Sequence, residues 1–294
     1  MGSIYIAIIM LCRVVQHLYT KRSSDSVNNM SCFLKYSAFR QLLSGALGLV
    51  LILIAQNGFK CNLETVLISV FAGLMIVLST GFSMAALKTG TVALAALFGT
   101  AGLLIPCVAG IFLFDEPMSI GQWCGVLMFF VAAYFLISSS SKIYSRFSLK
   151  TFFLLLGIMF AEGFTMLAQQ MFTFYVPDGD VSVFSFLSFG LVGVFMLLAS
   201  FIYTKKNGTS EDFKLTPKLW YWGAVLAVAI FVINQLATLA TAIVPPVILF
   251  TFINGGSTII GAVVAAVFFR EKLTVRSTVG IILGVLSMVI IKAM

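Results

Sequence analysis

Long runs of apolar residues, separated by short polar stretches, form the dominant pattern along this chain. A helix needs about 20 apolar residues to cross the core of a bilayer, and ten runs approach or exceed that length. Their continuity predicts helices, because membrane-spanning strands would show short alternating segments instead. The expected segments are 2–19, 37–56, 65–87, 90–114, 120–138, 151–175, 182–203, 218–242, 245–269 and 275–292.

One hairpin pattern occurs twice along the chain. Residues Phe112–Gly125 and Val267–Gly280 align without a gap, and the same register extends back into the preceding apolar runs. The matched pairs include Phe114 with Phe269, Glu116 with Glu271, Ser119 with Thr274, Gly125 with Gly280, Ala85 with Ala240, Val92 with Val247, Leu94 with Leu249 and Ile105 with Ile260. Internal similarity of this kind indicates two copies of one unit.

The repeat predicts two halves, residues 1–141 and 142–294, joined by a linker over 138–150. Each half holds five segments. Because five is odd, the second half enters the membrane in the opposite sense to the first. Inverted repeats of this kind are used by many secondary transporters to build a binding site near the midplane.

Composition agrees with a membrane class. The chain is 61% hydrophobic and 10% charged, whereas soluble domains carry about 25% charged residues. We therefore expect an all-α integral membrane protein. The first apolar run has no basic leader or small-residue cleavage site, so we interpret it as a spanning helix. The five cysteines are scattered without a CxxC pair, and no metal site or cofactor is expected.

Basic residues predict the orientation, since cytoplasmic loops of membrane proteins carry an excess of lysine and arginine. Of the 18 basic residues, 15 lie in or beside the loops that follow odd-numbered segments. They are Lys21, Arg22, Lys35, Arg40, Lys88, Lys142, Arg146, Lys150, Lys205, Lys206, Lys214, Lys218, Arg270, Lys272 and Arg276. These loops are expected in the cytoplasm, with both termini outside. Because the charges are spread over separate short loops, a nucleic-acid partner is not expected.

The repeated hairpin resembles that of the drug/metabolite transporter superfamily, in particular its EamA-type members with ten helices in two five-helix repeats. In the first copy the matching residues are Glu116, Ser119, Gln122 and Gly125, and in the second Glu271, Leu273, Thr274 and Gly280. The chain departs from the family pattern where Asp115 and Arg270 replace a turn glycine and Ser277 replaces the glutamine. The resemblance implies a transporter fold, often with the termini inside, whereas the basic residues predict the opposite orientation.

Glu162 is the strongest candidate for a functional side chain. It is an acidic residue in the middle of the apolar run 151–175, and an ionisable group at that depth is by default a functional hypothesis. Thr165 and Gln169 follow at helical spacing, so they share its face. Glu162 is expected to bind a proton or a cation in a central cavity. The alternative is a protonated structural residue, hydrogen-bonded to a neighbouring helix.

Arg13 and His17 lie one turn apart in the first segment, and Arg13 is a possible partner of Glu162 or of a substrate carboxylate. The alternatives are that Arg13 extends to the membrane surface and that His17 has no role. Further polar residues within apolar runs are expected to line the same cavity, or else to join helices by hydrogen bonds. They are Asn234, Gln235, Thr238, Thr241 and Asn254.

These features predict a secondary transporter of a small metabolite, an amino acid or a related zwitterion or amine, in the plasma or inner membrane. The alternative is an exporter of hydrophobic cationic drugs in which Glu162 exchanges a proton for the drug. An enzyme is not expected, because one histidine and no clustered aspartate or cysteine assemble no acid–base or metal constellation. The expected partners are a small-molecule substrate and the bilayer, for a monomer or a homodimer.

Overall fold

The computed structural model describes residues 2–24, 26–27, 30–55, 59, 61–88, 92–115, 118–140, 149–207, 216–268 and 274–293. Within these ranges the chain forms eleven α-helices and no strand. They are α1 (Gly2–Ser24), α2 (Met30–Ala55), α3 (Leu63–Lys88), α4 (Val92–Ala101), α5 (Leu104–Leu113), α6 (Ile120–Ser140), α7 (Leu149–Tyr175), α8 (Val181–Asn207), α9 (Pro217–Thr241), α10 (Pro246–Phe268) and α11 (Val275–Ala293). The all-α class is therefore confirmed for the described residues.

Several helices are longer than the hydrophobic pattern predicts, and α1 and α2 differ most at one end. Helix α1 continues to Ser24, and α2 begins at Met30 rather than at residue 37. The predicted start of the second segment is wrong because hydropathy alone excluded the polar first turns of α2. This difference matters for Arg40, which was counted beside a loop. It is well inside the helix instead, about three turns from Met30.

The predicted segment 90–114 is also wrong as one helix, because it is two. Helix α4 ends in a turn at Gly102 and Leu103, whose amides donate to Gly99 O at 3.1 Å and to Thr100 O at 3.2 Å. The turn lies against the backbone of α7. A Cβ on Gly163 of α7 would lie 2.5 Å from the carbonyl oxygen of Gly102, so this approach requires glycine.

The linker between the predicted halves is shorter than expected, since α6 runs through Ser140 and α7 begins at Leu149. The boundary between residues 141 and 142 lies outside the described residues. So do the hairpin residues Glu116, Phe269, Arg270, Glu271 and Leu273.

The helix starts explain some of the hairpin motif. Ser119 and Gln122 form a reciprocal capping box at the start of α6: the Ser119 amide donates to Gln122 Oε1 at 3.0 Å, and the Gln122 amide donates to Ser119 Oγ at 3.1 Å. Helix α9 begins in a similar way, with Thr216 as the N-cap and Pro217 in its first turn. The motif residues Ser119 and Gln122 therefore mark the start of a helix.

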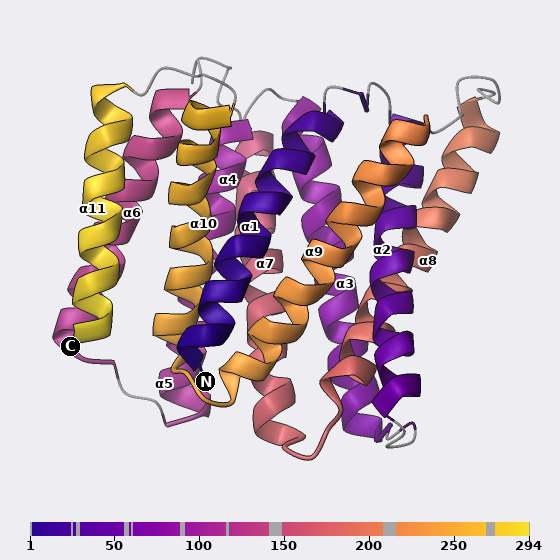
Figure 1. Cartoon of the computed structure of the whole chain (residues 1–294), viewed down its shortest axis with the longest axis horizontal. Coiled ribbons are helices and arrows are strands. Elements are labelled where there is room, and N and C mark those ends of the chain that lie inside the picture. The colour runs from indigo at the N-terminus through magenta and orange to yellow at the C-terminus, as the bar shows by residue number, and fades with distance from the viewer. Residues whose placement is uncertain are drawn as a thin grey trace.

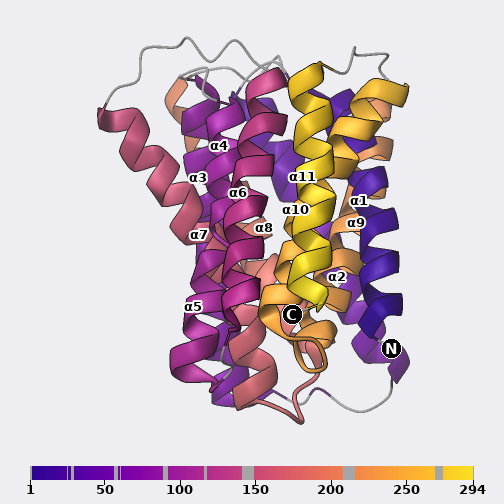
Figure 2. The same ribbon diagram turned by 90° about the vertical axis from the view of Figure 1, so that its left-hand side faces the viewer.

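The helices pack side by side in one bundle, with both chain ends at its lower end in Figure 1. Helix α6 packs along α11, and α2 packs along α8. Figure 2 shows the α6–α11 pair in front. A Cβ on Gly125 of α6 would lie 2.5 Å from Ile291 of α11, and Gly284 of α11 lies against Ile259 of α10. These glycines therefore serve close helix packing within the chain.

The charged helix ends are sorted between the two ends of the bundle (Figure 1). The upper end, called the basic end below, receives the ends of α1, α3 and α8 and the starts of α2, α7, α9 and α11. These carry Arg22, Lys35, Lys88, Lys150, Lys205, Lys206, Lys218 and Arg276. The lower end, called the acidic end, carries Glu64, Asp115, Asp178 and Asp180 beside the helix ends there, with Lys292 in the last turn of α11.

Within the described part of the chain, six helices include apolar stretches of 19 residues or more, which suffice to cross a membrane by length and composition. They are α1, α2, α3, α7, α8 and α9. Large apolar side chains point outward from the bundle, such as Leu11, Leu53, Phe112 and Ile120. An apolar exterior of this extent suits contact with lipid. These features indicate a helical membrane protein.

Candidate functional site

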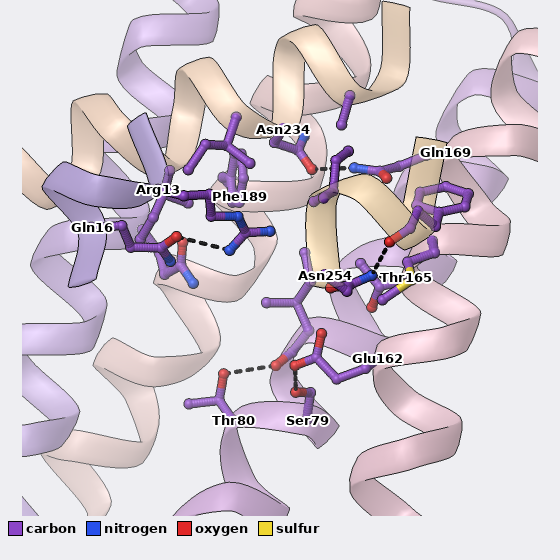
Figure 3. Close-up of a pocket in the computed structure, with 18 residues that line it drawn as sticks. Arg13, Gln16, Ser79, Thr80, Glu162, Thr165, Gln169, Phe189, Asn234 and Asn254 are labelled. Carbon is purple, nitrogen blue, oxygen red and sulfur yellow. Dashed lines mark hydrogen bonds between the residues drawn. The ribbon is translucent and has the colours of Figure 1, made fainter. Parts of the chain in front are cut away.

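A cavity of about 250 Å³ lies inside the bundle, between α1, α2, α3, α7, α8, α9 and α10. Apolar side chains, among them Met166, Phe189 and Phe250, form part of its wall. Its polar lining consists of Arg13, Gln16, Gln41, Ser79, Thr80, Glu162, Thr165, Gln169, Asn234 and Asn254. Five of the eight predicted site residues are therefore brought together here, namely Arg13, Glu162, Gln169, Asn234 and Asn254 (Figure 3).

Glu162 reaches the cavity from the middle of α7. Ser79 of α3 donates a short hydrogen bond to its Oε1 atom (Figure 3). Helix α4 brings a further backbone close, since a Cβ on Gly99 would lie 3.9 Å from Cγ of Glu162. The carboxyl group is thus held between α3, α4 and α7, with the cavity as its open side.

Arg13 extends into the same cavity from α1. Its Nη1 donates to Oε1 of Gln16 at 2.8 Å, and its buried Nε has no hydrogen-bond partner in the described part of the chain. The guanidinium and the Glu162 carboxylate interact electrostatically, yet they form no ion pair. Figure 3 shows the two groups entering the cavity from different helices. The site therefore presents separated charges of opposite sign.

Gln169 and Asn234 form the start of a hydrogen-bonded chain that leaves the cavity. Gln169 Nε2 donates to Asn234 Oδ1 at 2.6 Å, and Asn234 Nδ2 donates to Ser185 Oγ of α8 at 3.3 Å. Ser185 Oγ donates to Gln235 Oε1 at 2.9 Å, and Gln235 Nε2 donates to Ser182 Oγ at 3.0 Å. This chain joins α7, α8 and α9 on the way to the acidic end.

Three predicted site residues do not line the cavity. Gln235 belongs to the hydrogen-bonded chain just described. Thr238 is fully buried, and its hydroxyl donates to the Asn234 carbonyl at 2.9 Å. His17 Nε2 lies 2.9 Å from Ser257 Oγ, which links α1 to α10. The side chains of these three residues therefore form hydrogen bonds between helices or within one helix, and they do not face the cavity.

Asn254 lines the cavity from α10, and its amide is held in place. Nδ2 donates to the Phe250 carbonyl at 3.0 Å and lies 3.5 Å from Met166 Sδ of α7. Thr165 lines the cavity one turn after Glu162, with its hydroxyl donating to the Ala161 carbonyl at 2.8 Å. Both side chains are thus held by the backbone of their own helices, and that of Asn254 also contacts α7.

The prediction from sequence missed Gln16, Gln41, Ser79 and Thr80. Gln16 had a usable signal, because it follows Arg13 by one turn. Gln41 was passed over because α2 was predicted to start too late, which placed this residue near a helix end. Ser79 and Thr80 carry no signal of their own, since short hydroxyl side chains are common in membrane helices and often bond to their own backbone.

No protein-family model and no curated protein matches the sequence. Among solved structures, one chain described only as "Crystal structure of protein" matches with a TM-score of 0.79 at 14% identity. The match covers 98% of this chain and 95% of that chain. At this identity the likeness extends to the fold alone, and it shows that the whole bundle is shared with another protein.

Proposed function

We propose that this chain is a secondary transporter that carries a small metabolite through the central cavity. The first candidate is an amino acid or a related zwitterion or amine. The observation that carries the proposal is the placement of Arg13 and Glu162, which line one cavity without forming an ion pair. Opposite charges held apart in this way are available to the carboxylate and the ammonium group of a substrate.

Desolvated charges are costly unless they are paired or hydrogen-bonded. The bound substrate supplies these partners, with its carboxylate at Arg13 and its ammonium group at Glu162. When the substrate leaves, a proton or another cation replaces it at Glu162. A carboxylate that serves both ligands couples their movement, because they compete for the same charge.

The size of the cavity favours a metabolite over a drug. A volume of about 250 Å³ lies just below the range of about 300–1,000 Å³ that pockets for drug-sized ligands span. The second candidate function, proton-coupled export of hydrophobic cations, is favoured by one feature. Phe189 and Phe250 line the cavity and offer aromatic faces to a cation.

We further propose ten spans in two inverted repeats, as in the EamA-type drug/metabolite transporters. Besides the six long apolar helices there are four shorter apolar stretches, which together would make ten spans. The shorter stretches are Phe98–Leu113, Ile120–Phe135, Pro246–Ser257 and Thr278–Ala293. Several helix contacts recur under exchange of the halves, in which α1, α2 and α3 correspond to α7, α8 and α9, and this supports the repeat. The α1–α9 contact has its counterpart in α3–α7, and the α2–α9 contact has its counterpart in α3–α8.

In this proposal the protein is a multi-pass protein of the plasma or inner membrane with its basic end in the cytoplasm. Transport is driven by an ion gradient or by the substrate gradient, with no enzymatic activity and no cofactor. It acts as a monomer or a homodimer.

A current screen of reconstituted protein on a solid-supported membrane tests this function. Amino acids, amines and cationic dyes are applied in turn to liposomes with and without the protein. Currents with amino acids or amines support the proposal, while currents with dyes alone favour the drug exporter. If no compound gives a current or is accumulated in a parallel uptake assay, a transport function for this cavity is excluded for these classes.

A further inference from the structure

One face of α2 carries four polar side chains along the half of the helix nearest the basic end. Ser37, Arg40, Gln41 and Ser44 recur at helical spacing, so they share one side of the helix. Ser44 Oγ donates to the Ala227 carbonyl at 3.0 Å, which places this side against α9. These four residues are called the α2 polar face below.

Three buried polar atoms of the α2 polar face have no hydrogen-bond partner among the residues that the structure describes. They are Ser37 Oγ, Arg40 Nε and Gln41 Oε1. Gln41 is only 5% exposed, yet it lines the cavity. Buried polar groups are nearly always hydrogen-bonded, so each exception needs an explanation. Of the three residues only Gln41 lines the cavity, where its side-chain amide can accept from the ammonium group of a ligand at Oε1 and donate to a carboxylate from Nε2.

The charge inside the bundle points to the nature of that ligand. Arg13, Arg40 and Glu162 all lie near the middle of their helices, giving two positive charges against one negative. No described carboxylate forms an ion pair with either arginine, and Arg40 instead lies 5.9 Å above the ring of Tyr36. A charge in a low-dielectric interior acts over distances longer than a contact. The interior therefore favours a ligand with an excess of negative charge.

We propose that the α2 polar face and Arg13 form an anion-selective subsite, so that the substrate carries more carboxylates than cationic groups. This inference rests on the proposed transport function and narrows its substrate to acidic amino acids or small dicarboxylates. The two carboxylates and one ammonium group of an acidic amino acid complement the charges of Arg13, Arg40 and Glu162.

Each part of the subsite has a distinct role. Arg13 and Gln41 line the cavity and contact the ligand. Arg40 lies outside the lining, one residue from Gln41 and closer to the basic end. Its charge attracts an anion into the cavity and stabilises it there.

The test uses two ligands of nearly the same shape that differ in one charge, L-glutamate and L-glutamine, with succinate as a dicarboxylate. Binding is measured by isothermal titration calorimetry on the purified full chain, and uptake is measured with radiolabelled ligand in proteoliposomes. The variants are Arg40→Gln, Arg40→Lys and, as a matched control, Arg22→Gln, which removes an exposed charge at the basic end.

The wild-type protein is expected to prefer glutamate or succinate over glutamine. Arg40→Gln should reduce that preference about tenfold or more, because one positive charge near the site is lost. Arg40→Lys and Arg22→Gln should retain it. If Arg40→Gln does not fold, Gln41→Glu provides the second variant, since it adds a negative charge to the cavity wall and should lower glutamate affinity more than glutamine affinity.

Three outcomes would overturn the inference. Wild-type preference for glutamine, or an unchanged preference in both Arg40→Gln and Gln41→Glu, would show that the subsite does not select anions. Glutamine uptake under those conditions would leave the proposed transport function intact. If none of the three ligands binds or enters, the acidic substrate class is wrong, and the wider current screen decides separately on transport.

Discussion

The side-chain amide of Gln169 on α7 donates a 2.6 Å hydrogen bond to Oδ1 of Asn234 on α9, and both residues line the cavity. Toward the acidic end the same two helices meet again, where the hydroxyls of Thr173 and Thr241 lie 3.0 Å apart. Helices α7 and α9 are thus joined by polar contacts from the cavity toward the acidic end.

We predict that Asn234→Leu destabilises the protein, because it breaks the bonds to Gln169 and Ser185. Polar contacts between membrane helices contribute about 0.6 kcal/mol on average and up to about 1.7 kcal/mol. Loss of both bonds is therefore expected to cost about 1–2 kcal/mol in a reversible unfolding titration. Thr278→Ala is the control, since it removes an exposed hydroxyl bonded within α11. Equal stability of the two variants would contradict the prediction.

Glu162→Gln is expected to abolish transport driven by a pH gradient while leaving the fold intact. Glutamine keeps the volume and accepts the hydrogen bond from Ser79, but it cannot exchange a proton for a substrate cation. The measurement is uptake in proteoliposomes with and without an imposed pH gradient, with circular dichroism as the check on folding. Full gradient dependence in the variant would identify Glu162 as a structural residue.

Arg13→Gln should weaken recognition of the substrate carboxylate more than it weakens proton coupling. Its guanidinium lines the cavity with an unpaired Nε, whereas Glu162 is engaged by Ser79 on another helix. We expect the affinity for a carboxylate ligand to fall about tenfold or more. The affinity for the corresponding carboxamide is measured beside it, and an equal loss for both ligands would argue against a carboxylate contact.

Gly163→Ala should disrupt the site through the backbone. The added methyl group would lie 2.5 Å from the Gly102 carbonyl oxygen and from Ile105, so α7 and the α4–α5 turn must separate. Overpacking of this kind costs about 1–3 kcal/mol, and it should also displace Glu162. Gly190→Ala is the matched control, because no atom lies within 4 Å of a Cβ there. The measurement is the thermal unfolding temperature of both variants. An unchanged value for Gly163→Ala would contradict the close approach of Gly163 to Gly102.

The orientation is tested by labelling single cysteines in a cysteine-free background with a reagent that does not cross the membrane. Asp115→Cys at the acidic end should react in intact cells, and Lys205→Cys at the basic end should react only after the membrane is permeabilised. The reverse pattern would place the termini in the cytoplasm, as the resemblance to EamA-type transporters implies.

The sequence by itself determined which stretches form most of the helices, because helices in lipid must satisfy their own backbone over about 20 apolar residues. The sequence also predicted that Glu162, Arg13, Gln169, Asn234 and Asn254 line a cavity, because polar residues stand out within apolar runs. All five line the cavity. In these cases the physical cause is local, so hydropathy and helical spacing were sufficient.

Only the tertiary structure decided the remaining features. The break between α4 and α5 accompanies the contact of Gly102 with Gly163, and Ser79 meets Glu162 across α3 and α7. The interior position of Arg40 depends on where α2 begins. Three predicted site residues form hydrogen bonds between or within helices and do not line the cavity, namely Gln235, Thr238 and His17. Each outcome depends on which helices become neighbours, and the spacing of residues along one chain does not contain that information.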